Sequence, residues 1–322
     1  MIQLGQYAPP THVVAHFSDT HFLGGHRPLY GSVDTDGHLA KALEQLERSG
    51  AAPEAVVFTG DLADLAEPDA YDRLKRVIEP AAERMGAELI WVMGNHDERP
   101  PFSAAFFGAE TDEPLDRVHR LGGLRIIALD TSVPGYHHGE LRESQLEWLR
   151  TELATPAPDG TLLALHHPPI PTPIEIMAIL ELQGQDRLAD VLRDTDVRAI
   201  LAGHLHYSTA GTFAGIPVSV ASATCYTIDN SGGPGSLVGV DGGQSFNLVH
   251  VYEDSVVHTV VPVGDAPQVA GFSGVVLDAL AAMSPEERRE AFSSKTSTFN
   301  VADAEASAGR AAVDPDAEDA PV

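Results

Sequence analysis

Short apolar runs recur through the first two thirds of the chain, and each has the length of a β-strand. Most consist almost entirely of valine, isoleucine, leucine and alanine, which is typical of strands that are covered on both faces. The predicted strands span residues 12–17, 55–58, 88–93, 124–129, 161–165 and 197–202.

Helical periodicity fills several of the gaps between these strands. Leucines three or four positions apart predict two amphipathic helices, one over residues 36–49 and one after Glu143. A third helix is predicted over residues 68–85, although Pro80 should kink or end it. Strands that alternate with helices indicate βαβ units and a mainly parallel sheet.

After His206 the pattern changes to strands without intervening helices. The predicted strands span residues 209–213, 216–223, 247–252 and 256–263, with a turn at residues 253–255. We expect these strands to form a second sheet that packs on the first. Residues 229–243 are rich in glycine and lack apolar periodicity, which predicts a mobile loop.

The apolar pattern that indicates buried strands and helices weakens at about Gly264. We therefore predict a catalytic domain over residues 1–264 and an extension over residues 265–300. The extension contains one helix start, in which Ser284 is the expected N-cap and Glu287 completes a capping box. Residues 301–322 hold six acidic residues, one arginine and no aromatic residue, a composition typical of disorder. We expect this acidic tail to be non-catalytic.

Composition narrows the class of protein. The chain has 322 residues and is 43% hydrophobic, which suffices for one large α/β core. It shows neither a signal-peptide pattern at its start nor a run of about 18 apolar residues. Its single cysteine, Cys225, cannot form an intrachain disulfide and is expected to be a small buried residue. These features predict a cytoplasmic protein without a transmembrane segment.

The chain is strongly acidic. It has 20 Lys and Arg residues against 47 Asp and Glu residues, a formal net charge of −27. Such a charge repels polyanions, which argues against nucleic acid polymers and anionic membranes as main partners. A small anionic substrate is compatible with it, because salt screens charges beyond roughly 8 Å and bound cations reverse the field locally.

Five polar clusters directly follow apolar runs, so one fold could gather them at the carboxyl edge of a sheet. They offer carboxylates, an amide oxygen and several imidazoles, which are the ligands that two hydrolytic metal ions need. Because no thiolate is among them, these donors suit Mn, Fe, Zn or Co. The clusters are Asp19-Thr20-His21, Gly60-Asp61, Gly94-Asn95-His96-Asp97, His166-His167 and Gly203-His204-Leu205-His206.

Electrostatics assigns a special role to Asp61. Two divalent ions about 4 Å apart would repel each other by roughly 17 kcal/mol at an effective dielectric of about 20. Anions must therefore lie between them, and Asp61 is the natural bridging carboxylate, with a bound hydroxide as the second bridge. This hydroxide can attack a phosphoester, because metal binding lowers the pKa of water from 15.7 to about 7. His96, beside Asn95, is best placed to protonate the leaving alkoxide or to hold a phosphate oxygen.

In this order, the clusters resemble the signature of calcineurin-like metallophosphoesterases over about residues 12–206. Residues 91–97, 162–170 and 200–227 look especially like the mycobacterial class III cyclic-nucleotide phosphodiesterases. The resemblance implies an α/β fold, the four-layer αββα sandwich of two mixed sheets. It also implies a homodimer that hydrolyses 3′,5′-cyclic AMP to AMP, with 2′,3′-cyclic nucleotides as further substrates.

The resemblance further implies a dinuclear centre of Fe and Mn, with Zn, Co or two Mn ions as alternatives. Asn95 and His96 are then expected to contact the substrate. The ligands implied for the first ion are Asp19, His21, Asp61 and His206, and those for the second are Asp61, Asn95, His166 and His204.

Several residues keep two interpretations. His166 ends its apolar run and matches the family position, whereas His167 either supports it from behind or belongs to the following turn. His138 either contacts the substrate or is a solvated loop residue. Asp97 is expected to orient a ligand histidine or to cap a helix. Tyr207 either stacks on a base or packs in the core.

Two other functions also stay open at the level of sequence. The same site could hydrolyse a glycerophosphodiester or a phosphomonoester, because substrate-contacting loops lie outside the ligand motifs. A metal-retaining scaffold protein is the third interpretation, with the acidic tail as its binding segment.

Overall fold

The computed structural model describes residues 3–297 except residues 234, 270, 272 and 273. Residues 10–265 form one compact unit. The described residues outside that range belong to a second, smaller unit. The disorder predicted for residues 301–322 concerns positions outside the described residues.

The first sheet of the larger unit has five strands in the order β15-β14-β1-β2-β3. Strands β1, β2 and β3 are parallel to one another, whereas β14 and β15 run antiparallel to their neighbours. The bounds are β1 His12–Phe17, β2 Ala55–Thr59, β3 Glu88–Val92, β14 Ser245–Val251 and β15 Val256–Pro262.

The second sheet has six strands in the order β10-β11-β9-β8-β5-β4. Its four central strands β11, β9, β8 and β5 are parallel, and the two edge strands are antiparallel. The bounds are β4 Arg117–Leu121, β5 Leu124–Leu129, β8 Thr161–Leu165, β9 Val197–Ala202, β10 Thr209–Phe213 and β11 Ile216–Val220.

Alternation of side chains along each strand divides the core into three apolar layers. In β2, Val56 and Phe58 pack toward the helices, whereas Ala55 and Val57 pack toward the other sheet. Strand β8 alternates in the same way between the layer shared by the two sheets and the layer beneath its own helices. Inner strands such as β2 and β8 are therefore buried on both faces, which explains why they appear in the sequence as nearly continuous apolar runs.

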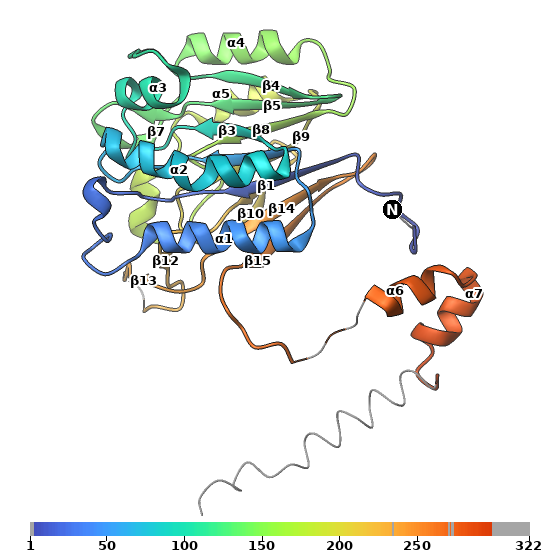
Figure 1. Cartoon of the computed structure of the whole chain (residues 1–322). Coiled ribbons are helices and arrows are strands. Elements are labelled where there is room, and N and C mark those ends of the chain that lie inside the picture. The colour runs from blue at the N-terminus through green and yellow to red at the C-terminus, as the bar shows by residue number, and fades with distance from the viewer. Residues whose placement is uncertain (1–2, 234, 270, 272–273, 298–322) are drawn as a thin grey trace, which may run out of the picture. The chain divides into compact units, whose positions relative to one another are not determined.

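Helices cover the outer face of each sheet. In Figure 1, α1 and α2 lie across the first sheet, and α4 lies over the second. The result is the expected four-layer αββα sandwich with two mixed sheets. The helices are α1 Thr35–Ser49, α2 Pro68–Met85 and α3 Arg99–Phe107 on the first sheet, and α4 Glu143–Leu153 and α5 Gln185–Leu192 on the second.

The strands after His206 do not form a sheet of their own, so that prediction is wrong. Strands β10 and β11 extend the second sheet, and β14 and β15 extend the first. The physical reason is that an apolar run records burial but not the partner strand, which depends on contacts between residues far apart in the chain.

Helix α2 continues through Pro80, contrary to the expectation that it could end there. Pro80 lies on the exposed side, whereas Tyr71, Leu74 and Ile78 are completely buried against the first sheet. The backbone hydrogen bond that Pro80 removes is therefore lost on the side of the helix that faces solvent. The apolar contacts on the buried side keep the chain helical on both sides of the proline.

Short elements account for the remaining described segments. The glycine-rich stretch predicted as a loop contains β13, which pairs with β12. The predicted capping box is confirmed, because the Ser284 hydroxyl accepts from the Glu287 N–H and the Glu287 side chain accepts from the Ser284 N–H. These elements are η1 Gly24–His26, β6 Ser132–Val133, β7 Tyr136–Gly139, η2 Glu175–Leu180, β12 Thr227–Ile228, β13 Gly239–Val240, α6 Gly274–Ala281, α7 Pro285–Arg288 and η3 Arg289–Ser293.

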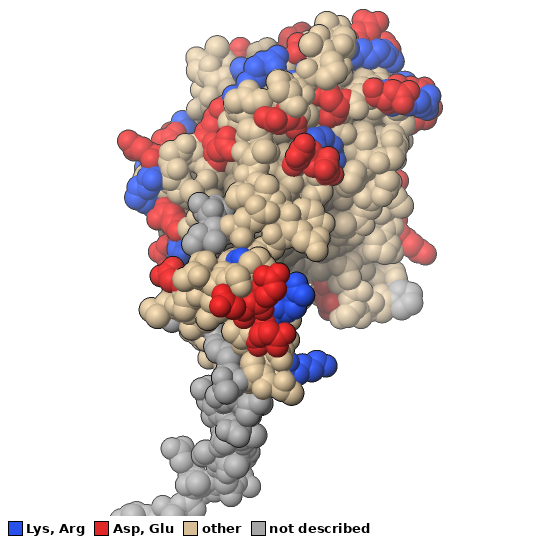
Figure 2. Space-filling view, turned by 90° about the vertical axis from the view of Figure 1, so that its right-hand side faces the viewer, with Lys and Arg blue, Asp and Glu red and all other residues tan. Residues whose placement is uncertain are grey.

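The surface agrees with the acidic composition. On the face shown in Figure 2, Lys and Arg side chains lie beside Asp and Glu side chains and form no continuous basic area. Among the described residues, no helix combines the length and the apolar character needed to cross a membrane.

A buried arginine joins three neighbouring strands of the second sheet at the end opposite the polar clusters. Arg125 of β5 donates to the Thr161 hydroxyl at 2.8 Å and to both carboxylate oxygens of Asp196 at 2.9 and 3.1 Å. Its side chain is 3% exposed and that of Asp196 is 12% exposed. The pair therefore holds the starts of β5, β8 and β9 together.

We expect Arg125→Leu to lower the free energy of unfolding by about 3 kcal/mol, because it leaves the Asp196 carboxylate buried without its partner. Urea titration followed by circular dichroism measures this loss. The matched control is Arg120→Leu, at the exposed position opposite Arg125 in β4, where we expect a change within about 0.5 kcal/mol. Equal effects of the two substitutions would contradict the assigned role.

Candidate metal centre

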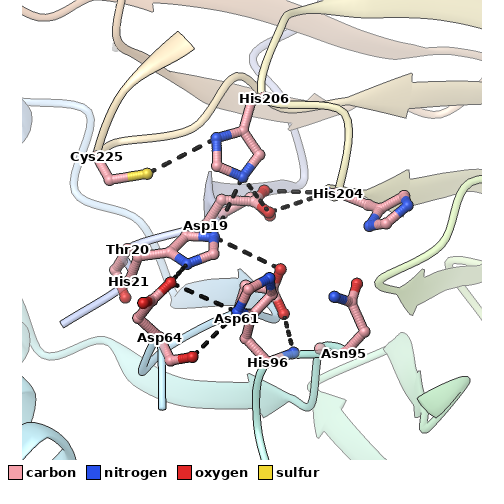
Figure 3. Close-up of polar contacts among 12 residues, drawn as sticks. Asp19, Thr20, His21, Asp61, Asp64, Asn95, His96, His204, His206 and Cys225 are labelled. Carbon is pink, nitrogen blue, oxygen red and sulfur yellow. Dashed lines mark hydrogen bonds and ion pairs between the residues drawn. The ribbon is translucent and has the colours of Figure 1, made fainter. Parts of the chain in front are cut away.

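The predicted clusters converge where five parallel strands end. The loops after β1, β2 and β3 of the first sheet meet the loops after β8 and β9 of the second. One ligand atom from each of four buried side chains lies within 4.8 Å of the others, and Figure 3 shows how these side chains face one another. The four residues are Asp19, His21, Asp61 and His206.

The backbone at this edge is unusual. The left-handed region is uncommon for residues other than glycine. Strained conformations of this kind persist where the surrounding structure holds them, and they concentrate at functional sites. Five residues of the clusters nevertheless have a positive φ, namely Asp19 (52°), His21 (45°), Asp61 (52°), His204 (72°) and His206 (58°).

Glycines of the motifs allow the loops to approach one another. A Cβ atom at Gly94 would overlap the Asp61 carboxylate, and one at Gly203 would overlap the Ser18 hydroxyl. A methyl group at either position would therefore push a carboxylate or its support out of place. This explains the glycine in Gly94-Asn95-His96-Asp97 and in Gly203-His204-Leu205-His206.

The contacts of the Nδ1 atoms fix the tautomers of His21 and His206. His21 Nδ1 lies 2.9 Å from the Asp64 carboxylate, and His206 Nδ1 lies 3.0 Å from the Tyr226 carbonyl oxygen. Because both partners can only accept, each Nδ1 carries the proton and each Nε2 presents a lone pair. The two Nε2 atoms nevertheless face each other at 3.1 Å. A cation between or beside them would make this arrangement favourable.

The same logic applies to His166. Its Nδ1 donates to the Thr59 carbonyl at 2.6 Å, which leaves the lone pair on Nε2. That Nε2 lies 3.2 Å from Asp61 Oδ2 and 3.0 Å from Asn95 Oδ1, both of which are acceptors. Nearby, His204 Nε2 is buried and has no hydrogen-bond partner within the described part of the chain. When the His166 ring is neutral, acceptor atoms face acceptor atoms here too, and either a proton or a metal ion on Nε2 relieves the repulsion.

The electrostatic field of the site favours positive charge. Burial opposes the imidazolium form of His166, but the Asp61 carboxylate outweighs it and raises the pKa of His166 to about 9. Burial likewise opposes ionisation of Asp61, yet His166 holds the pKa of Asp61 well below its usual range. Burial lowers the pKa of His206 to about 4 and that of His204 well below its usual range. Neutral imidazole is the form that binds a metal ion.

Asn95 is oriented for the same role. Its Nδ2 lies 2.9 Å from His137 Nδ1, which directs the carbonyl oxygen toward His166. His137 was not among the predicted site residues, whereas His138 was. The contact recorded for the His138 ring is with Tyr136, at 5.3 Å between ring centroids. Strand β7 is extended, so adjacent side chains point to opposite faces, and sequence alone cannot say which of the two histidines faces the site.

The His167 ring lies next to the rings of His166 and His204, but its two nitrogens contact other groups. Its Nδ1 contacts the Thr131 hydroxyl at 2.8 Å, and its Nε2 donates to the His137 carbonyl at 3.1 Å. Burial and the nearby His166 lower the pKa of His167 to about 3. Both ring nitrogens are thus engaged with other groups, whereas His166 Nε2 points into the cluster.

Two aspartates support the loops in ways that the sequence did not reveal. Asp64 contacts His21 Nδ1, as described above. Asp97 accepts from the backbone N–H groups of Leu62, Ala63 and Gly94 and from the Tyr71 hydroxyl. It neither caps α3, whose N-cap is Glu98, nor contacts a ligand histidine, contrary to our expectation. Burial raises the pKa of Asp97 to about 6.

His96 differs from the other histidines of the cluster in its exposure. Its side chain is 30% exposed, whereas that of His166 is completely buried. Its backbone N–H donates to Asp61 at 2.8 Å, and its Nδ1 donates to the Asp64 carbonyl at 3.0 Å. His96 therefore lies at the rim, where a molecule in solution can reach its Nε2.

The residues present fit a pair of metal ions. Imidazole lone pairs, carboxylates and one amide oxygen converge, and the Nδ1 contacts of His21, His166 and His206 hold these rings in the tautomer that presents Nε2 to the cluster. Cys225, by contrast, is buried with its Sγ 3.8 Å from His206 Nδ1, and burial raises the pKa of its thiol well above its usual range. A protonated thiol is a weak ligand, so the oxygen and nitrogen donors determine the chemistry of the site.

The calcineurin-like phosphoesterase family matches residues 12–208 of the chain. Over 272 residues the chain is 58% identical to the cAMP/cGMP dual specificity phosphodiesterase of Mycobacterium tuberculosis, which covers 84% of this chain and 86% of that protein. It is also 54% identical over 264 residues to the "Probable cyclic nucleotide phosphodiesterase" of Rhodococcus erythropolis, covering 82% of this chain and 87% of that protein.

Among solved structures, the fold is similar to that of a dimetal phosphatase from Danio rerio. The TM-score is 0.59 at 17% sequence identity, and the match covers 80% of this chain and 98% of that chain. At this level of identity the similarity concerns the fold alone.

We expect Gly94→Ala to reduce the metal content of the purified protein by at least about tenfold, because the added methyl group displaces the Asp61 carboxylate. Mass spectrometry of the metal after dialysis measures the content. Gly242→Ala is the matched control, since a Cβ there meets nothing within 4 Å, and it should retain the metal. A Gly94→Ala protein with a native circular dichroism spectrum and full metal content would refute this role of the glycine.

Proposed function

We propose that this chain, which belongs to the calcineurin-like phosphoesterase family, is a dinuclear-metal phosphodiesterase that hydrolyses 3′,5′-cyclic AMP to AMP. The observation that carries the proposal is the cluster of Asp19, His21, Asp61 and His206, in which histidine lone pairs and carboxylates face one another. The substrate comes from the relative in Mycobacterium tuberculosis, which is named for its action on cAMP and cGMP. 2′,3′-Cyclic nucleotides are proposed as further substrates.

We assign the ligands in two sets that share Asp61. The first set consists of Asp19, His21, Asp61 and His206, and the second of Asp61, Asn95, His166 and His204. The position of Asp61 Oδ2 supports the sharing, since this one oxygen lies 3.5 Å from His21 Nε2 and 3.2 Å from His166 Nε2. This carboxylate thus stands between the two histidine groups.

When bound, the two ions would supply a water deprotonated near neutral pH and would neutralise the charge of the phosphoryl oxygens. We propose Fe and Mn as the native pair, with Zn, Co or two Mn ions as alternatives, because oxygen and imidazole donors accept all of them. The residues of the chain hold the donors in place through Asp64, Thr59 and the Tyr226 carbonyl.

The reaction adds water to phosphorus and breaks the bond between phosphorus and the 3′-oxygen. The 3′-oxygen leaves as an alkoxide and needs a proton. We assign this proton transfer to His96, because its half-buried ring lies at the rim and its Nδ1–H is already engaged by the Asp64 carbonyl. The proton is therefore exchanged at Nε2. Asn95 is proposed to contact the substrate, and His137 rather than the predicted His138 is the β7 histidine that faces the site beside it.

A homodimer and a cytoplasmic location are further proposals that rest on the resemblance to cyclic-nucleotide phosphodiesterases. Light scattering of the purified protein tests the first. A mass of one chain at micromolar concentration would exclude the dimer.

We expect the purified protein with Mn²⁺ to convert 3′,5′-cyclic AMP to AMP, and to hydrolyse bis(p-nitrophenyl) phosphate faster than p-nitrophenyl phosphate. Chromatography of the nucleotides and absorbance of p-nitrophenolate measure the two activities. Faster hydrolysis of the monoester would favour a phosphomonoesterase. If both 3′,5′- and 2′,3′-cyclic nucleotides stay intact while glycerophosphodiesters are cleaved, the proposed substrate is wrong.

We expect Asn95→Ala to lower kcat for cyclic AMP by at least about 100-fold without unfolding the protein, because it removes an oxygen donor from the second ligand set. Circular dichroism and steady-state kinetics measure the two effects. Asn230→Ala, at an exposed position, is the matched control. Unchanged turnover in Asn95→Ala would favour the scaffold interpretation.

A further inference from the structure

A cavity of about 430 Å³ adjoins the metal centre and has no role in the chemistry described so far. It is bounded by the segment before α1 and by the β12–β13 hairpin. Its volume lies within the range of small-molecule sites, roughly 300–1,000 Å³. The lining residues that matter here are Tyr30, Val33, Tyr226, Ile228, Val240 and Asp241.

The cavity shares one wall with the metal centre. The Tyr226 ring lies 4.5 Å from the His206 ring and 6.4 Å from the His21 ring, measured between ring centroids. The Tyr226 carbonyl also accepts from His206 Nδ1. The Tyr226 ring therefore separates a ligand in the cavity from the candidate metal ligands.

One tyrosine of the cavity is held in place and another is open. The β12–β13 hairpin packs closely on the Tyr226 ring, because a Cβ added at Gly239 would lie 2.9 Å from two of its ring carbons. Tyr30 is 72% exposed, its ring stands edge-on to Tyr226 at 5.4 Å, and the two hydroxyls are 3.4 Å apart. Tyr30 thus offers a free aromatic face beside a fixed wall.

The other lining residues favour a flat, apolar ligand with a polar edge. Val33, Ile228 and Val240 supply aliphatic surface. Asp241 supplies a carboxylate, which Gln244 Nε2 orients by donating to it at 2.9 Å. None of the described lining residues is Lys, Arg or His, so the cavity has no cation for a phosphate. Exocyclic amino groups of nucleobases, in contrast, are donors that a carboxylate accepts.

We propose that this cavity binds the base of the nucleotide and that Tyr30 is the surface on which the base stacks. This proposal rests on the proposed function, because it assumes that the phosphate lies at the metal centre. Separate parts of the chain would then recognise the two ends of the nucleotide. The cavity would recognise the base by shape and stacking, and the metal centre would recognise the phosphate by charge. Tyr30 and Val240 determine specificity for the base and take no part in the bond-breaking step.

Tyr30→Ala should raise KM for cyclic AMP about tenfold with little effect on kcat, because stacking binds substrate and transition state alike. Tyr30→Phe should restore the wild-type KM, since it keeps the aromatic face. Tyr7→Ala truncates another exposed tyrosine, outside the larger unit, and should leave KM unchanged. An unchanged KM in Tyr30→Ala would overturn the proposal.

Val240→Trp provides a second test that fills the cavity while residue 30 stays a tyrosine. It should lower kcat/KM for cyclic AMP about tenfold relative to kcat/KM for ribose 3′,5′-cyclic phosphate that lacks a base. Equal losses on the two diesters would mean that the substitution disturbs the metal centre and would count against the cavity as a base site. A change in oligomeric state without a change in this ratio would identify the surface as a protein contact.

Calorimetric titration with AMP separates failure of this proposal from failure of the proposed function. If the wild-type protein hydrolyses no cyclic nucleotide but binds AMP, and Tyr30→Ala weakens that binding about tenfold, the base site stands and the function is wrong. If the wild-type protein hydrolyses cyclic AMP, but the Tyr30→Ala and Val240→Trp variants bind AMP as tightly as the wild type does, the assignment of the base site is wrong. A protein that binds no AMP and turns over no cyclic nucleotide refutes both.

Discussion

At the edge where the two sheets meet, hydrogen-bond acceptors of histidine and aspartate side chains face one another, and the rest of the site is built around this constraint. His21 Nε2 and His206 Nε2 are 3.1 Å apart, and each of these rings already uses its Nδ1–H elsewhere. The Asp61 carboxylate lies next to a third such nitrogen, that of His166. Lone pairs and negative charges at these distances repel unless a cation is shared among them. The surrounding loops must hold the donors against that repulsion.

The means of holding them are distributed around the site. Positive φ values at Asp19, His21 and Asp61 bend the chain where the strands end, and glycines let the loops come close. Asp97 gathers the loops after β2 and β3 through backbone N–H groups, so the geometry does not depend on any one ligand. Strain in the backbone and close glycine contacts therefore belong to the same arrangement as the ligands themselves.

The sequence predicted what local patterns can encode. Apolar runs marked the strands, and the polar residue after each run marked the site, because strand ends of parallel sheets meet at one edge. It could not assign β10, β11, β14 and β15 to their sheets, since strand partners depend on contacts distant in the chain. Tyr30 and His137 were missed for a related reason. Each lies in a loop or a short strand whose direction only the folded structure defines.

The candidate centre lies on the seam between the two sheets, with Asp61 supplied by one and His166 by the other. The spacing of these donors is therefore set by the thickness of the apolar layer between the sheets, which contains Val57 and Ala164. Metal–ligand distances tolerate deviations of only about 0.2 Å. During evolution, conservative exchanges of aliphatic residues in that layer would thus retune metal preference while every ligand stays the same. A laboratory search for variants with altered metal selectivity has its most productive targets there, beneath the site and out of contact with the ions.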